Sequence, residues 1–312
     1  MKKFPTEFLS TTEIGGVGEM IYKAVRFPAY AIEYDEEGYE VIVPLHSVSV
    51  PPKSGTDYRL TGQDLLASIC NLYIKINNPD SSVSISEAIR EWCVDNIYPY
   101  DNDALCELLE SVPNAYVELW EIIQNDATFR VKDFIKNLCA IGTTFEFNEV
   151  LNKYSANPEK ARDFYYEGRL CDSLPFFEKY SVYENDSNYI KHIDEDYNKL
   201  QQQVIDLFPD FRMRLKINPR NQKIEYGADV HSVFDICWYT FARMLAQESA
   251  PIDRGDEYCE GSILSCMACG EFFVRHSSRQ RYCQKWDCQA ARNRKNRNAS
   301  YARHKNDKKQ NK

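Results

Sequence analysis

Four cysteines between residues 266 and 288 have the type and spacing of metal ligands. They form two pairs, Cys266-Met-Ala-Cys269 and Cys283-Gln-Lys-Trp-Asp-Cys288, with thirteen residues between the pairs. Thiolate sulfur is soft and anionic, which suits a Zn²⁺ ion in tetrahedral geometry. The spacing therefore predicts one structural Zn²⁺ ion held by these four cysteines. Because four thiolates saturate the ion, we expect no catalytic role for it.

A basic stretch follows the last of these cysteines. Residues 286–304 have a helical pattern, in which Arg292, Lys295 and Arg303 fall along one stripe. Arginine and lysine bind phosphates, and arginine also pairs with the edge of guanine. The predicted nucleic-acid contacts are Arg275, Arg279, Arg281, Arg292, Arg294, Lys295, Arg297 and Arg303. The uncharged candidates for contacts to bases or sugars are Asn293, Asn296 and Asn298. The alternative is a solvated basic tail that only improves solubility.

The charge of the chain is divided unequally along its length. Residues 271–312 contain 13 Lys and Arg against 3 Asp and Glu, a net charge of +10. The whole chain carries −9, so residues 1–270 carry a net charge of −19. An acidic surface repels phosphate groups. Contact with a polyanion is therefore predicted only for the basic C-terminal part.

The composition is that of a globular protein of one or two domains. The chain has 312 residues, and 43% of them are hydrophobic, which is enough for a sizeable core. No apolar run approaches the roughly 20 residues of a membrane helix. Met1-Lys-Lys-Phe-Pro-Thr-Glu is not followed by an apolar stretch, so no secretory signal is expected. We predict a cytoplasmic protein without a membrane partner.

The other cysteines fit buried free thiols in a reducing compartment better than disulfides. The chain has 11 cysteines, an odd number. Those in apolar periodic segments are Cys70, Cys93, Cys106, Cys139, Cys171 and Cys237. Cys259 lies near the cluster and is interpreted as a bystander, with a role as spare ligand as the alternative.

Hydrophobic periodicity predicts a mainly α fold with a small β element (α+β). Residues 20–60 contain short strand-like runs, and residues 211–226 have the pattern of a β-hairpin. Helices are predicted from Thr61, after Ser84, and over 102–111, 114–124, 128–140, 143–153, 158–171, 187–208 and 231–248. The predicted domains are an acidic, mostly helical body over 1–255, a Cys₄ zinc finger with a basic helix over 262–305, and a disordered tail over 306–312.

The loop between the cysteine pairs contains residues that help a small module fold. Gly270 directly after Cys269 gives the first turn freedom in φ. Phe272 and Phe273 are predicted to form the miniature core of the finger. A finger of this size has no other hydrophobic core, so its fold should depend on the metal.

In this region the chain resembles the bacterial CGNR-type zinc finger. The corresponding elements are Cys266-Met-Ala-Cys269, Phe272-Phe273, Ser277-Ser-Arg-Gln-Arg, Tyr282-Cys283 and Cys288-Gln-Ala-Ala-Arg-Asn-Arg. The match covers about 40 residues, from the first cysteine through the basic helix. Gln289-Ala-Ala replaces the Gly-Asn-Arg of the family, and the first cysteine pair is closer than expected. The resemblance implies a transcriptional regulator with a helical, ligand-sensing N-terminal domain.

Three functions remain open from the sequence. The first is a DNA-binding regulator, whose body senses a small molecule or forms a homodimer. The second is a protein-interaction module, in which the basic finger docks on an acidic partner or on the body of its own chain. The third is an enzyme with its active site in the body. No nucleophile elbow, HExxH motif or complete phosphate-binding loop is present in the sequence, so we expect no enzyme.

Overall fold

The computed structural model describes most of the body and nearly all of the basic C-terminal part. The described residues are 6–10, 21–45, 61–78, 82–100, 120–156, 204–217, 224–246, 262–277 and 279–310. The helices predicted over 102–111 and 158–171 lie outside these ranges, as does most of the one predicted over 187–208. Cys106, Cys171 and Cys259 also lie outside them.

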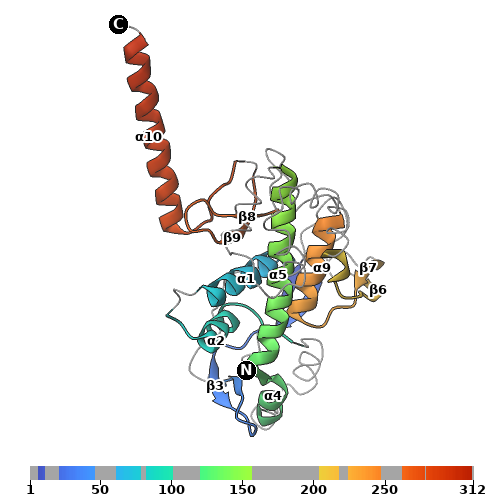
Figure 1. Cartoon of the computed structure of the whole chain (residues 1–312). Coiled ribbons are helices and arrows are strands. Elements are labelled where there is room, and N and C mark those ends of the chain that lie inside the picture. Colours follow the sequence, from blue (N-terminus) through green and yellow to red (C-terminus); the bar gives the residue numbers. More distant parts are fainter. Residues whose placement is uncertain are drawn as a thin grey trace, which may run out of the picture.

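The fold is mainly helical with small antiparallel sheets, which confirms the predicted fold class (Figure 1). The helices are α1 (Gly62–Asn77), α2 (Ile85–Asp95), α4 (Trp120–Ala127), α5 (Val131–Ala156), α9 (Val233–Ala246) and α10 (Trp286–Gln310). The strands are β1 (Thr6–Ser10), β2 (Ile21–Val25), β3 (Tyr30–Tyr34), β4 (Glu40–Pro44), β5 (Phe129–Arg130), β6 (Met213–Ile217), β7 (Ile224–Ala228), β8 (Ile263–Ser265) and β9 (Phe272–Val274).

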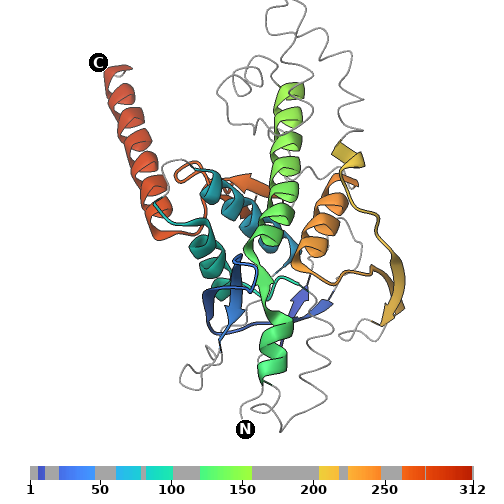
Figure 2. The same ribbon diagram turned by 60° about the horizontal axis from the view of Figure 1, so that its bottom comes forward.

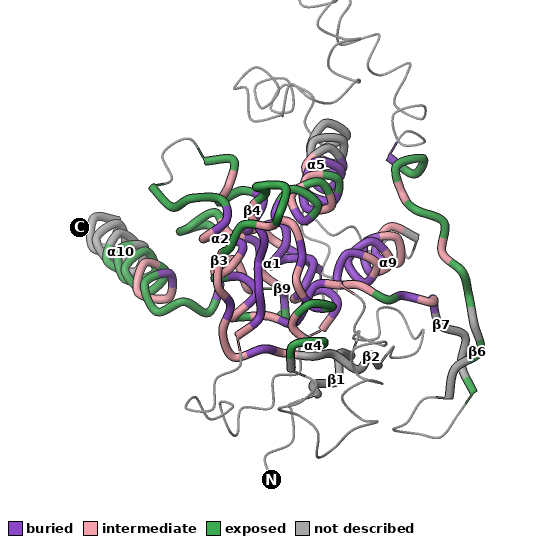
Figure 3. Tube along the Cα trace, turned by 90° about the horizontal axis from the view of Figure 1, so that it is seen from below, coloured by how far each residue is buried: buried purple, intermediate pink, exposed green. Residues whose placement is uncertain are grey.

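Helix α1 is the centre of the body. Its start is fixed by a capping box: the Thr61 hydroxyl accepts a hydrogen bond from the Asp64 N–H, and the Asp64 carboxylate accepts one from the Thr61 N–H. The helix packs against α2, α5, α9 and β9. Figure 3 shows the buried residues gathered along α1, α9 and the part of α5 beside them. Helix α1 therefore connects the other helices of the body to the strand β9.

Strands β3, β4 and β5 form a three-stranded antiparallel sheet against the helices. The turn between β3 and β4 is organised by Asp35, whose Oδ1 accepts hydrogen bonds from the N–H groups of Glu37 and Tyr39. Gly38 in this turn has φ of 82°, a conformation that residues with a Cβ rarely adopt. Strands β3 and β4 lie within residues 20–60, where the sequence predicts short strands.

Helix α5 differs from the prediction, because it is one continuous helix over Val131–Ala156. The sequence predicts separate helices over 128–140 and 143–153. The gap between them contains Gly142, a weak helix former. In the fold Gly142 lies directly against the ring of Tyr73, so α1 and α5 approach closely at this point. Packing between helices therefore overrides the local propensity.

Several other local predictions are confirmed. Strands β6 and β7 pair as the predicted hairpin, with Met213 opposite Ala228. Helix α9 lies within the range predicted from residue 231. Cys70, Cys93 and Cys237 are buried and Cys139 is partly buried, and none of these four forms a disulfide. Within the described part of the chain, no helix combines the length and apolarity that crossing a membrane requires.

Candidate metal centre and basic helix

The first cysteine pair lies in a tight turn that joins β8 to β9. The N–H of Gly270 donates to the carbonyl of Cys266 at 2.8 Å, and the N–H of Cys266 donates to the carbonyl of Glu271 at 2.8 Å. Gly270 has φ of 78°, a positive value that glycine adopts readily, as predicted for this turn. The hydroxyl of Ser265 donates to the Gly270 carbonyl at 2.8 Å. This network holds Cys266 and Cys269 at one end of the ribbon formed by β8 and β9.

The second cysteine pair joins the ribbon to α10. Cys283 precedes the helix, and Cys288 lies in its first turn. The N–H of Met267 donates to the carbonyl of Arg281 at 3.0 Å, which fixes the second pair beside the first. Lys285 and Glu271 form an ion pair across the two segments, at 2.6 Å from Nζ to Oε1. This pairing raises the pKa of Lys285 above its ordinary value.

The four sulfur atoms converge on one point. The Sγ atoms of Cys266, Cys269, Cys283 and Cys288 all lie within 4.8 Å of one another. The Cys269 and Cys283 sulfurs are 3.8 Å apart, too far for a disulfide. Sulfurs bound at about 2.3 Å around a tetrahedral ion stand about 3.8 Å apart, so the cluster has the size of such a site. Four cysteine thiols thus form a candidate metal site, as the spacing predicts.

Most of the site is shielded from solvent. Cys266, Cys283 and Cys288 are buried, and Cys269 is exposed. Phe273 and Tyr282 pack against the buried sulfurs. The prediction that Phe273 supplies a small core for the finger is therefore confirmed. Four cysteine ligands, three of them buried, are compatible with a structural metal site.

The backbone favours negative charge on one of the four sulfurs. Burial alone would raise the pKa of Cys266, but N–H groups of Cys269, Cys283 and Ala268 lower it to about 6. Burial raises the pKa of Cys283 and of Cys288. Hydrogen bonds with the neighbouring sulfurs raise the pKa of Cys288 further, and repulsion between its charge and that of Cys266 adds a smaller contribution. A divalent cation would reverse this repulsion and hold all four thiols as thiolates.

The ribbon that carries the first cysteine pair is anchored to the body by Asn71 of α1. The N–H of Phe272 donates to Oδ1 of Asn71 at 2.7 Å, and Nδ2 of Asn71 donates to the Phe272 carbonyl at 2.9 Å. The amide of Asn71 thus satisfies both outward-facing backbone groups of Phe272, as a neighbouring strand would. The sequence did not indicate this role. The available signal was a single amide within the mostly apolar run from Leu65 to Leu72.

The side chains of the ribbon belong partly to the core of the body. Phe272 and Ile263 are members of the main hydrophobic cluster, which also contains α1, α5 and α9 residues. The Phe272 ring packs edge to face on Phe145 of α5, with ring centroids 5.2 Å apart. Phe272 therefore packs into the body and not into a separate core of the finger, contrary to the prediction. The predicted domain boundary at 255–262 lies outside the described residues except for its last residue.

Replacing Asn71 by alanine is expected to loosen the ribbon from α1. The change leaves the N–H and carbonyl of Phe272 without their partner, and an unsatisfied buried group costs about 1–3 kcal/mol. We expect the free energy of unfolding to fall by about that amount, and hydrogen exchange at the Phe272 amide to accelerate. The control is Asn77→Ala, which removes only a hydrogen bond within α1. Unchanged protection of the Phe272 amide in Asn71→Ala would contradict the anchoring role.

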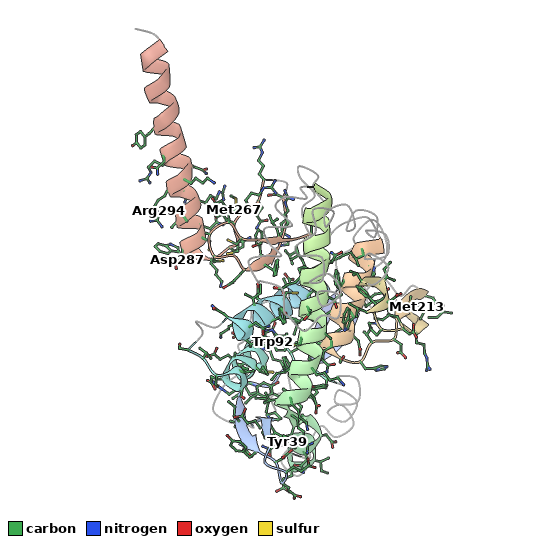
Figure 4. All side chains as sticks on the ribbon, in the orientation of Figure 1. Tyr39, Trp92, Met213, Met267, Asp287 and Arg294 are labelled. Atoms are coloured by element: carbon green, nitrogen blue, oxygen red, sulfur yellow. The ribbon has the colours of Figure 1, made fainter. Side chains whose placement is uncertain are left out.

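Helix α10 projects from the body as an isolated rod (Figures 1 and 2). It has 25 residues, about 37 Å at about 1.5 Å per residue. Asp287 lies at its base, and Arg294 lies about two turns further along (Figure 4). The helix predicted over 286–304 is confirmed, and it continues to Gln310, past the residue where the sequence predicts a disordered tail. Trp286 and Tyr301 are 81% and 69% exposed.

The predicted nucleic-acid contacts fall into three groups. Those exposed on the surface are Arg279, Arg292, Arg294, Lys295 and Arg297, and Arg281 is half-buried. The side chain of Arg303 lies outside the described part of the chain. Arg275 is fully buried, and its Nε donates to the carbonyl of Ser277 at 3.2 Å. The prediction that Arg275 contacts nucleic acid is therefore wrong for this structure, since no phosphate can reach a buried guanidinium.

Comparison of the chain with known proteins found no match. No protein-family model matches the chain, and neither the curated proteins nor the solved structures contain a match.

Proposed function

We propose that this chain binds one Zn²⁺ ion and uses α10 to bind nucleic acid, with DNA as the preferred form. The observation that carries the proposal is the convergence of four sulfurs at the base of an exposed basic helix. Sets of four thiolates select zinc or iron, and zinc is the usual ion of small structural sites. Its role is to close the turn from the ribbon into α10 and so to set the direction of the helix.

The charge distribution supports a polyanionic partner. Arg292, Arg294 and Lys295 are exposed on a helix that packs extensively against no other described element. Residues 1–270 carry the opposite net charge, −19, and would repel a polyanion. Binding should therefore be confined to the finger and its helix. The projection of α10 away from the body favours an external partner over docking on the chain's own body (Figure 2).

A salt series tests the nucleic-acid interface. Arg292→Ala combined with Lys295→Ala should weaken binding of the full-length, zinc-loaded chain to duplex DNA. The slope of log K against log salt concentration should become shallower by roughly 0.9 for each lost phosphate contact, or about 1.8 in total. The measurement is fluorescence anisotropy of a labelled duplex at several salt concentrations, beginning at low salt.

The control removes the same charge from the body. Lys136→Ala combined with Arg212→Ala changes two exposed basic residues outside the finger. This variant should keep the slope of the unmodified chain or bind slightly more weakly. If the α10 variant and the body variant behave alike, binding does not use α10 and the proposal fails. Metal analysis of the same preparations should give about one zinc ion per chain, as four thiolate ligands hold one ion.

The function of the body follows from that of the finger. We propose that the chain is a transcriptional regulator whose body senses a ligand or forms a homodimer, as the resemblance to CGNR-type fingers implies. The support within the structure is the anchoring of the ribbon to α1. Through this contact a change in the body can alter the position of α10. The homodimer can be tested by measuring DNA binding over a range of protein concentrations. If the chain binds DNA as a dimer, the affinity per chain should fall on dilution.

A further inference from the structure

One face of α10 combines amides and arginines in an arrangement suited to a DNA groove. Asn293 and Asn296 lie next to each other on the helix surface, with Arg292 on one side and Arg297 on the other. At about 100° per residue the four positions cover an arc of about 140°. All four side chains are exposed. We call these four residues the recognition face.

The recognition face is continuous with exposed aromatic surface. Trp286 falls within the same arc around the helix axis, about two turns nearer the metal site than Asn293. Its side chain is 81% exposed. A tryptophan left this exposed is a common feature of surfaces that contact a partner. The remaining described basic residues of the helix, Arg294 and Lys295, lie outside the arc.

We infer that α10 lies in the major groove of duplex DNA, with Asn293 and Asn296 in contact with the base edges. The inference rests on the proposed function and assigns specificity within it. An asparagine amide can pair bidentately with N6 and N7 of adenine. Arg292 and Arg297, on the two sides of the amides, reach the phosphates of the two strands that border the groove. The amides select the sequence, and the arginines hold the helix in register.

The dimensions of the helix select duplex DNA over RNA. A helix with its side chains is about 10–12 Å wide, and the major groove of B-DNA is about 12 Å wide. The major groove of A-form RNA is too narrow and deep for side chains to enter. Helix α10 is freely accessible along its described turns, since it stands away from the body (Figures 1 and 4). It can therefore enter a groove without a collision with the body near those turns.

The metal site positions one edge of the recognition face. Nε2 of Gln289 donates to the carbonyl of Cys283 at 2.6 Å. Oε1 of the same glutamine accepts a hydrogen bond from Nη1 of Arg292 at 3.0 Å. Arg292 is thereby connected through Gln289 to the second cysteine pair. Folding of the metal site thus orients the arginine that borders the amides.

The first experiment is a selection from a pool of random duplexes with the full-length, zinc-loaded chain. We expect a preferred sequence that contains adenines. Asn293→Ala and Asn296→Ala should each reduce the preference for that duplex over a scrambled one, on the order of tenfold to a hundredfold. The salt slope should stay unchanged, because no phosphate contact is lost. The matched control is Asn298→Ala, an exposed asparagine on the same helix outside the arc, which should keep the preference.

The second experiment removes the acceptor on the DNA. Replacing a selected adenine by 7-deazaadenine deletes N7 in the major groove and leaves base pairing and the minor groove intact. The unmodified chain should lose the preference at that position, and the asparagine variant responsible for it should show no further loss. This coupling would identify which asparagine contacts which adenine.

The experiments distinguish failure of the inference from failure of the proposed function. Equal binding to all duplexes, or a preference that survives both asparagine substitutions and 7-deazaadenine, overturns the inference while nucleic-acid binding stands. Stronger binding to RNA than to duplex DNA also overturns it. Absence of binding to any nucleic acid at low salt overturns the proposed function, and the inference fails with it.

Discussion

Replacing Cys283 by serine is expected to abolish metal binding by the full chain. Its sulfur is 3.8 Å from that of Cys269, and its N–H donates to the sulfur of Cys266 at 3.3 Å. Serine keeps the shape but is a far poorer zinc ligand than a thiolate. Structural zinc sites contribute about 10–16 kcal/mol of apparent binding free energy. We expect the purified variant to contain almost no zinc, as measured by elemental analysis.

The loss of metal should also destabilise the body. Phe272 and Ile263 leave the main core if the ribbon unfolds, and burying each side chain contributes about 1.5–3 kcal/mol. A chelator should therefore lower the melting temperature of the unmodified chain and have no further effect on Cys283→Ser. The control is Cys139→Ser, which changes a thiol outside the cluster and should keep the zinc. A zinc-free Cys283→Ser variant with an unchanged melting temperature would show that the ribbon folds without the ion.

Substituting Gly142 by alanine should destabilise the chain, although alanine is the better helix former. The new Cβ would lie 2.2 Å from Cγ of Tyr73 and 2.5 Å from its Cδ2. The Tyr73 ring is buried, and Thr143 Oγ1 donates a hydrogen bond to its hydroxyl at 3.3 Å. Overpacking costs about 1–3 kcal/mol, against a propensity gain of about 1 kcal/mol. We expect a net loss of up to about 2 kcal/mol in the free energy of unfolding, measured with denaturant.

A second variant separates the steric effect from propensity. In a Tyr73→Ala background the ring is absent, so Gly142→Ala should become neutral or stabilising by up to about 1 kcal/mol. Ala140→Gly, at an exposed position of the same helix, should cost about 1 kcal/mol through propensity alone. If Gly142→Ala stabilises the unmodified chain, α1 and α5 do not approach as closely as the structure has them.

Features with a local cause could be predicted from the sequence. The cysteine cluster follows from spacing within 23 residues, because a tight turn and a helix start bring each pair together. The hairpin of β6 and β7 follows from the alternation of side chains along short strands. Helix α9 follows from apolar residues that recur at helical spacing. The cap of α1 follows from Thr61 and its neighbours. In each of these the deciding contacts lie close together along the chain.

Features that depend on distant contacts could not be predicted. Asn71 and Phe272 are 201 residues apart, and nothing near either residue indicates their pairing. Arg275 is fully buried, whereas its sequence neighbourhood is that of an exposed basic loop. The continuity of α5 through Gly142 depends on the ring of Tyr73 in another helix. Each error arose where packing between elements outweighs the preference of a single residue.

The side-chain amide of Asn71 lies at the point where the ribbon is attached to the body, and α10 extends far from this point. The amide fixes the ribbon, the ribbon carries two sulfurs, and the shared ion would fix the first turn of α10. A tilt of about 10° at this pivot moves the tip of a rod of about 37 Å by about 6 Å, nearly two base pairs along a duplex. Small rearrangements around α1 would thus cause a displacement of several ångströms at the C-terminal end of α10.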